Sequence, residues 1–164
     1  MYKKFFIPLF IGVLLAGCGK SGTSNGNAPA APGAESATSA AVVEITAGDS
    51  MKYSLLRIDS KAGQEIKISL TNTGTMPKAV MGHNLVVLKK DTDVKAFADA
   101  AIAAAATEYI PASMADKIVA HTKLLGAKES DEISFTLSEP GEYTYLCSFP
   151  AHYLTGMRGV IVVR

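Results

Sequence analysis

The sequence has little excess charge of either sign and no long apolar run. Of its 164 residues, 16 are basic and 15 are acidic, so the formal net charge is +1. This balance argues against a nucleic-acid partner, which would need a strongly basic surface. The most apolar segment, residues 5–15, is shorter than the roughly 20 residues that a membrane-spanning helix needs.

Cysteine is also scarce and occurs only as Cys18 and Cys147. In an exported chain, two cysteines would usually suggest a disulfide. However, Cys18 ends the apolar N-terminal run, whereas Cys147 lies in a segment that also holds a histidine and a methionine. The two cysteines therefore belong to segments with different expected functions, and we expect no disulfide between them.

Residues 1–17 have the pattern of a bacterial export signal. Lys3 and Lys4 precede the apolar segment, and Leu15-Ala16-Gly17-Cys18 resembles the lipobox of bacterial lipoproteins. We expect cleavage before Cys18 and lipidation of its thiol; the alternative is an ordinary signal peptide followed by an unrelated cysteine. Several acyl chains would anchor the protein firmly, since a single chain binds membranes only marginally.

Residues 18–41 start with the lipidated cysteine and continue as a linker rich in Ala, Gly, Ser, Pro and Asn. Such a segment buries too little apolar surface to offset its ordering entropy, so we expect a flexible tether. The mature protein would lie in the periplasmic space, and Lys20 after the cysteine favours the outer membrane by analogy with lipoprotein sorting. The folded domain would then span residues 42–164, a usual single-domain length.

Short runs of alternating apolar and polar residues, separated by turn residues, cover this domain. In residues 131–137, for example, Ile133, Phe135 and Leu137 fall on one face. Strands are predicted at residues 42–45, 52–58, 65–71, 83–88, 118–125, 131–137, 142–147 and 159–163. Eight short strands with few helices predict an all-β sandwich or barrel.

Residues 93–106 break this pattern. Val94, Phe97, Ala98, Ala101 and Ala105 recur at the i, i+3, i+4 spacing of a helix. The segment is mostly alanine and offers only a narrow apolar stripe. We expect one short helix outside the sandwich, capped at its N-terminus by Thr92 or Asp91.

The segment near the C-terminus carries a candidate metal site. Cys147, His152 and Met157 supply a thiolate, an imidazole and a thioether, three of the four ligands of a blue-copper electron-transfer site. Taken singly, each residue also fits a packing role in a core. The second imidazole would come from His83, which strand alternation places at the end of a core-facing row, as it does Cys147.

Two segments, Val80-Met-Gly-His-Asn84 and Cys147-Ser-Phe-Pro-Ala-His152, resemble the copper-binding segments of the azurin family of cupredoxins, and Val119–Gly126 is similar to a third azurin segment. The resemblance spans most of residues 42–164. It implies an eight-stranded Greek-key β-sandwich with one type 1 copper ion per chain. His83, Cys147 and His152 would be strong equatorial ligands, Met157 a weak axial ligand, and the Gly82 carbonyl a weak or absent axial one.

The chain departs from the usual azurin pattern at several positions. Four residues separate His152 from Met157, one more than azurins usually have, so the ligand loop looks more like that of auracyanin or rusticyanin. The typical azurin disulfide has no counterpart. Leu85 replaces a frequent tryptophan, and Asn72 stands where many azurins carry a pH-sensitive histidine, so we expect that titration to be missing.

The resemblance also implies roles for neighbouring residues. Asn84 would tie the two ligand segments together and tune the sulfur by hydrogen bonding. Phe149 and Pro150 would shield the thiolate from water. We expect His152 to be the site of electron exchange, surrounded by an apolar partner patch; its residues would be Met76, Val80, Met81, Ala151, Tyr153 and Leu154. For Met76 and Met114 a place at the core edge is the alternative, and His121 is expected at the surface.

These observations predict a membrane-tethered single-electron carrier that cycles between Cu(II) and Cu(I). Its partners would be redox proteins such as c-type cytochromes or a copper-containing reductase or oxidase, met by a monomer in weak, transient complexes. The alternative is a lipoprotein that binds or delivers copper. We expect no enzyme, because once His83 and His152 are used only His121 remains as a further imidazole.

Overall fold

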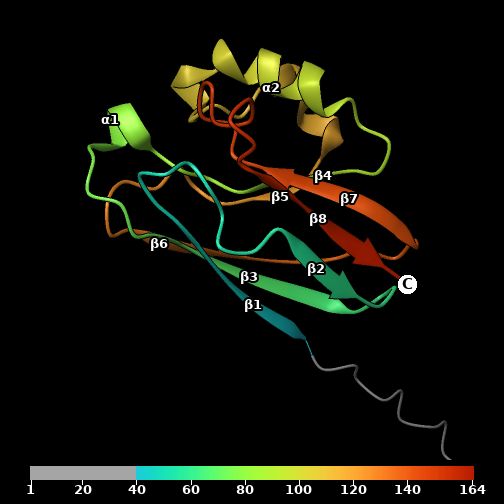
Figure 1. Cartoon of the computed structure of the whole chain (residues 1–164). Helices are drawn as coiled ribbons and strands as arrows, with labels where there is room; N and C mark the ends of the chain where they lie inside the picture. Colours follow the sequence, from blue (N-terminus) through green and yellow to red (C-terminus); the bar gives the residue numbers. More distant parts are fainter. Residues whose placement is uncertain (1–39) are drawn as a thin grey trace, which may run out of the picture. The chain divides into compact units, whose positions relative to one another are not determined.

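The computed structural model describes residues 40–164. The predicted signal peptide, the lipidation of Cys18 and the linker up to residue 39 lie outside these residues. The described part consists of two β-sheets packed face to face, with helical segments at one end and on one outer face (Figure 1).

The first sheet has three strands, in the order β1 (Ala41–Ala47), β3 (Glu65–Asn72) and β6 (Ser130–Thr136). β1 runs parallel to β3, and β6 runs antiparallel to it. The alternation in β3 directs its apolar side chains to one face, where Ile66, Ile68 and Leu70 are fully buried. This face forms one wall of the core.

The second sheet has five strands, in the order β2 (Arg57–Ser60), β8 (Arg158–Val163), β7 (Gly141–Leu146), β4 (Val86–Leu88) and β5 (Ile118–His121). β2 pairs parallel to β8, and the other pairs are antiparallel. Leu85, Tyr145 and Ile161 point inward and belong to the same buried cluster as the apolar residues of the first sheet. The predicted eight-stranded all-β sandwich is confirmed.

The outer face of the five-stranded sheet is covered by α2 (Val94–Ile102) (Figure 1). Phe97 is buried in a second apolar cluster with Val86, Leu88 and Leu146, so the predicted helix does lie outside the sandwich. Its N-cap was misassigned: the cap is Asp93, whose carboxylate accepts a hydrogen bond from the Ala96 N–H at 3.0 Å.

The predicted helix is also too long, since α2 ends at Ile102. The alanines that follow form instead the 3₁₀ turn η1 (Ala105–Thr107), and a second 3₁₀ segment, η2 (Ala112–Lys117), leads into β5. A short helix that the sequence did not predict, α1 (Lys78–Met81), begins directly after Pro77. No helix among residues 40–164 has the length and apolar character needed to cross a membrane.

Three predicted strands include residues that do not belong to regular ladders. The 83–88 strand begins only at Val86, the 118–125 strand ends at His121, and the 52–58 strand is shifted, since β2 begins at Arg57 and runs to Ser60. Beyond these bounds single bridges replace the ladder, between His83 and Leu125 and between Ala47 and Tyr53. His83 and Leu125 thus lie in irregular backbone outside the ladders, and this backbone forms part of the site described next.

Candidate metal centre

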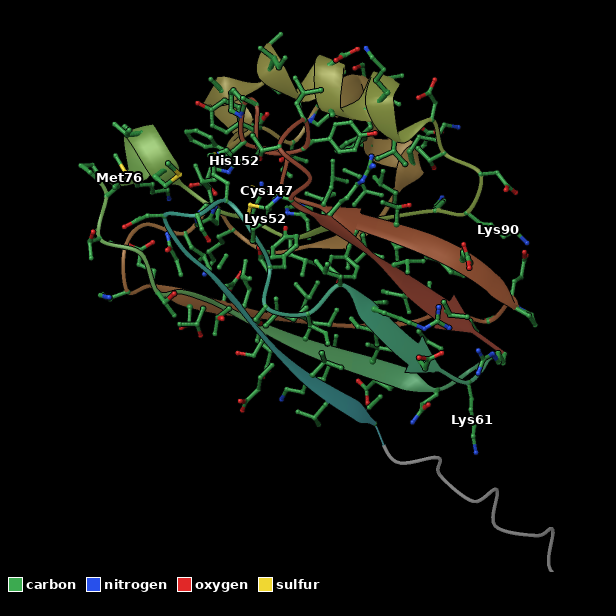
Figure 2. All side chains as sticks on the ribbon, viewed as in Figure 1. Lys52, Lys61, Met76, Lys90, Cys147 and His152 are labelled. Atoms are coloured by element: carbon green, nitrogen blue, oxygen red, sulfur yellow. The ribbon has the colours of Figure 1, made fainter. Side chains whose placement is uncertain are left out.

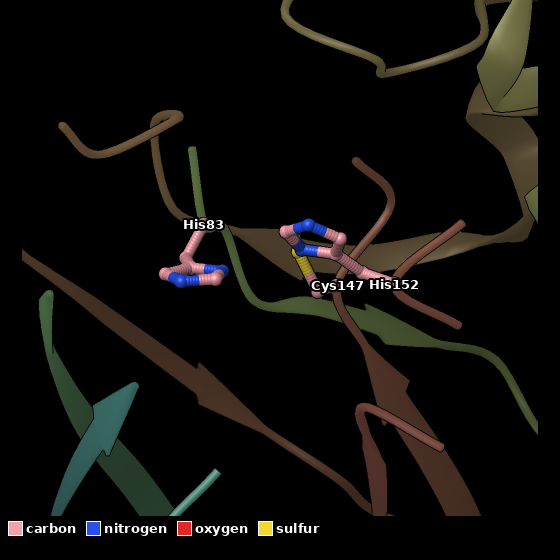
Figure 3. Close-up of side chains that lie close together, drawn as sticks. All are labelled: His83, Cys147 and His152. Carbon is pink, nitrogen blue, oxygen red and sulfur yellow. The ribbon is translucent and has the colours of Figure 1, made fainter. Parts of the chain in front are cut away.

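Three side chains from separate parts of the chain converge at this end of the sandwich (Figure 3). His83 lies between α1 and β4, Cys147 directly follows β7, and His152 lies in the turn between β7 and β8. One nitrogen from each imidazole and the cysteine sulfur all lie within 4.8 Å of one another, and all three residues are buried. Cys147 Sγ is 3.4 Å from His152 Nδ1.

Hydrogen bonds hold both the backbone and the ring of His83 in place. Its main chain exchanges hydrogen bonds with Leu125, and its Nε2 lies 3.0 Å from the carbonyl oxygen of Gly48. Among the described residues, His83 Nδ1 is the buried side-chain polar atom that has no hydrogen-bond partner. If Nε2 carries the proton and donates it to Gly48, Nδ1 presents a lone pair to the cluster, as in a metal-binding histidine whose other nitrogen contacts a carbonyl.

Burial keeps both imidazoles neutral. It lowers the pKa of His83, and it lowers the pKa of His152 to about 4, with a further contribution from the charge that His83 would carry. The two rings are close, with centroids 5.0 Å apart. At neutral pH both rings therefore have the uncharged form that a metal requires.

The cysteine needs a cation to ionise. Burial raises the pKa of the Cys147 thiol to about 12, although backbone hydrogen bonds from Asn84 and Phe149 act in the opposite direction. Cys147 is a free thiol. A desolvated thiolate and two neutral imidazoles, with an unpaired nitrogen aimed at the cluster, are a donor set that suits copper. The residues present thus fit the metal that the sequence predicts.

The ligand loop, residues 147–157, is closed by its own backbone. Cys147 N–H donates to the Met157 carbonyl at 3.1 Å, and Met157 N–H donates to the His152 carbonyl at 3.0 Å. Ala151 and Gly156 take left-handed backbone conformations that turn the chain sharply. Met157 is fully buried, and these two backbone hydrogen bonds join it directly to Cys147 and His152.

Gly82 lies beside His83 because no larger residue fits there. A Cβ atom at this position would lie 2.8 Å from the Lys78 carbonyl oxygen and 3.0 Å from Leu124 Cγ. The glycine lets α1 end closely packed against the segment that follows β5. This close packing fixes the backbone immediately before the first imidazole.

Asn84 connects the two ligand segments. Its Oδ1 accepts a hydrogen bond from the Ser148 N–H at 2.9 Å, and its Nδ2 donates to Ser148 Oγ at 2.8 Å. Both residues are buried. The residue after His83 is thereby tied to the residue after Cys147.

Aromatic rings cover His152 on one side. The Phe149 ring centroid is 4.7 Å from that of His152, and Tyr109 packs edge-on against Phe149 at 5.0 Å. Pro150 is half-buried at the start of the turn that carries His152. Tyr109 was missed by the sequence analysis. It adopts a left-handed φ of 65°, which nothing in the local sequence indicates.

The predicted partner patch has exposed apolar members at the site end. Met76, Val80 and Leu154 are 37%, 53% and 71% exposed, and Figure 2 shows Met76 on the same side as His152. Of the other patch residues, Ala151 is exposed, and Met81 and Tyr153 are half-buried.

Two further residues lie outside this patch. His121 is exposed, as predicted. Met114 is half-buried and packs against the cluster beneath α2. His152 itself is only 2% exposed, so its side chain is buried.

Comparison with known proteins agrees with this geometry. The family model described as copper binding proteins, plastocyanin/azurin family, matches residues 39–164. Azurin from Alcaligenes faecalis is 37% identical over 123 residues, which cover 73% of this chain and 94% of that protein. Outer membrane protein H.8 from Neisseria meningitidis is 42% identical over 113 residues, covering 66% of this chain and 60% of the relative's length.

A solved structure supports the same assignment. Reduced auracyanin from Roseiflexus castenholzii matches with a TM-score of 0.68 and 36% identity, covering 77% of this chain and 99% of that chain. The residues that the family model matches, 39–164, include the sandwich and all three converging side chains. The buried His83–Cys147–His152 cluster is consistent with one copper ion, and the chain belongs to the plastocyanin/azurin family of copper-binding proteins.

Proposed function

We propose that this protein is a membrane-tethered carrier of single electrons in the periplasmic space. The observation that carries the proposal is the buried His83–Cys147–His152 cluster with its unpaired His83 Nδ1. The copper ion, when bound, supplies the one-electron couple between Cu(II) and Cu(I).

Copper would be held by His83 Nδ1, Cys147 Sγ and a ring nitrogen of His152. Met157 would add a weak thioether donor, and the Gly82 carbonyl would be a weaker donor or none. The hydrogen bonds from His83 to Gly48 and across the ligand loop restrain these donors before any metal arrives. Because little has to move when the electron moves, such a restrained site suits electron transfer more than copper delivery.

His152 is the proposed point of electron exchange. Its ring is the ligand within a turn whose Ala151 and Leu154 are exposed, and Figure 2 shows the exposed Met76 on the same side. Val80, in α1, is exposed as well. An apolar patch of this kind supports a small contact that forms and breaks quickly. The partners would be redox proteins such as c-type cytochromes or a copper-containing reductase or oxidase, each met by a monomer.

Asn84, Phe149 and Pro150 act around the ligands. Asn84 holds the two ligand segments together through Ser148, and Phe149 packs against the His152 ring and limits access of water to the thiolate. Among residues 40–164 there is no second cluster of three potential metal-binding side chains. We therefore propose transfer of electrons and no catalytic reaction.

The tether rests on the N-terminal pattern. The lipobox-like Leu15-Ala16-Gly17-Cys18 supports cleavage of residues 1–17 and lipidation of Cys18. The relative from Neisseria meningitidis is named as an outer membrane protein, which supports anchoring to that membrane. Residues 18–41 would then connect the anchor to the copper domain.

Copper loading of the full-length protein in detergent tests the function. We expect about one copper per chain, an intense visible absorption from the copper–thiolate bond, and a reversible one-electron redox wave. A colourless copper adduct, or one without a reversible wave, would instead support copper delivery. The wild-type protein should incorporate a labelled fatty acid, and Cys18→Ala should not; equal labelling of the two would refute lipidation of Cys18.

A further inference from the structure

Residues 48–53, between β1 and β2, contact both segments that carry the copper ligands. The Gly48 carbonyl holds the His83 ring, and the Tyr53 hydroxyl donates to the Asn84 carbonyl at 2.5 Å. On the other side, Lys52 Nζ donates to the Thr155 carbonyl, within the turn between His152 and Met157. Residues 48–53 supply no metal ligand, yet they form hydrogen bonds to the segment that carries His83 and to the turn that carries His152.

The position of Lys52 suits a cation. Residues 151–156 form a helix-like turn, in which Thr155 N–H donates to the Ala151 carbonyl and Gly156 N–H donates to the Tyr153 carbonyl. Carbonyl groups at the end of such a turn lack partners within it, and a cation there is favourable. Lys52 Nζ is the protein donor that the structure provides for the Thr155 carbonyl.

Gly156 makes room for the lysine. A Cβ atom at this position would lie 3.2 Å from Lys52 Nζ, and the backbone φ of 89° disfavours any side chain. The ammonium group therefore lies directly over the turn. Figure 2 shows Lys52 at the same end as Cys147 and His152, whereas Lys61 lies at the opposite end of the sandwich.

Lys52 belongs to none of the ion pairs found among the described residues, so its charge is not neutralised by a nearby carboxylate. Its hydrogen bond joins residues 103 positions apart in the chain. Its ammonium thus ties the ligand loop to the segment that orients the other imidazole.

We propose that Lys52 is a positioning residue of the copper site. By tying the Thr155 carbonyl to the segment that holds His83 through Gly48, Lys52 sets the separation of the two imidazoles. The effect of Lys52 on a bound copper ion rests on the proposed function, but its hydrogen bond to Thr155 exists in the protein without metal. The proposal can therefore be tested in both the metal-free and the copper-loaded protein.

The first test uses hydrogen exchange in the full-length, metal-free protein. In Lys52→Met, the amides of His152 and Met157 should exchange about fivefold faster, the effect of losing one partly exposed hydrogen bond to a charged group. Lys52→Arg keeps a cationic donor and should restore most of the protection. Lys61→Met, a matched change at the far end, should leave these amides unaltered.

The second test uses the copper-loaded variants. Lys52→Met should change the copper–thiolate absorption and the reduction potential, whereas Lys52→Arg should keep the wild-type absorption and Lys61→Met should change neither property. The role proposed for Lys52 is wrong if Lys52→Met behaves like Lys61→Met in hydrogen exchange, absorption and reduction potential. The electron-carrier function is judged separately, from the copper-loaded wild type: a blue protein supports it and a colourless one refutes it. If the wild type is colourless, the hydrogen-exchange experiment on the metal-free protein still decides the role of Lys52.

Discussion

Replacing Asn84 with alanine should weaken the fold and the copper site together. The Asn84 amide is buried and makes two short hydrogen bonds with Ser148, one to its N–H and one with its hydroxyl. Alanine cannot replace either bond. The substitution therefore cuts the direct side-chain link between the segment that follows His83 and the segment that follows Cys147.

The size of the effect follows from the burial of Ser148, which is itself almost inaccessible. Leaving a buried donor or acceptor unsatisfied costs about 1–3 kcal/mol, so the two lost bonds amount to about 2–6 kcal/mol. Domains of this kind are usually stable by about 5–15 kcal/mol in total. Asn84→Ala should therefore fold, but with a large part of its stability lost.

Urea denaturation of the metal-free protein measures this loss, and Asn72→Ala provides the control. Asn72 is similarly buried and makes two side-chain hydrogen bonds, from the Gly74 N–H at 2.9 Å and to the Leu125 carbonyl at 3.2 Å. Asn84 makes one more, a longer bond from its Nδ2 to the Glu108 carbonyl at 3.4 Å. Asn72 has no hydrogen bond to the Cys147 segment; it reaches His83 only through the Leu125 carbonyl, which also accepts the His83 N–H. Both variants should lose similar stability.

Only Asn84→Ala should also bind copper more weakly, by about tenfold or more, as is typical when a group that orients metal ligands is removed. A competition titration with a chelator measures this difference. A copper affinity of Asn84→Ala equal to that of the wild type would refute the view that Asn84 joins the ligand segments. A stability loss below about 1 kcal/mol would contradict the reasoning from unsatisfied buried groups.

Three further predictions concern the ligands. Cys147→Ser should abolish the blue absorption but keep the circular dichroism of a folded sandwich, and retained colour would disprove the ligand assignment. Met157→Leu should keep the colour and raise the reduction potential, because it removes a donor that favours Cu(II); an unchanged potential in voltammetry would mean that Met157 only packs. Burial lowers the pKa of His83 and lowers that of His152 to about 4. In the unfolded chain both histidines have an ordinary pKa of about 6.5. Below that pH the unfolded chain therefore binds more protons than the folded protein does. The metal-free protein should accordingly lose stability as the pH falls from about 6.5 towards 4, and urea midpoints that stay constant over this range would contradict burial of neutral imidazoles.

The strand pattern and the ligand spacing were readable from the sequence because both are local. Alternation in β3 places Ile66, Ile68 and Leu70 on one face whatever lies opposite. The Cys147–His152–Met157 spacing is likewise contained in one short segment. Element bounds were less predictable, as the early end of α2 shows, since neighbouring contacts decide where regular pairing stops.

The tertiary structure decided which distant groups complete the site. The Gly48 carbonyl, the Lys52 ammonium and the Tyr109 ring are unremarkable in the sequence, and each acts only because folding brings it beside a ligand segment. The sequence by itself determined the chemistry: a thiolate, two imidazoles and a thioether on an all-β chain. The separation and orientation of these groups depend on contacts between residues far apart in the chain, which local patterns do not encode.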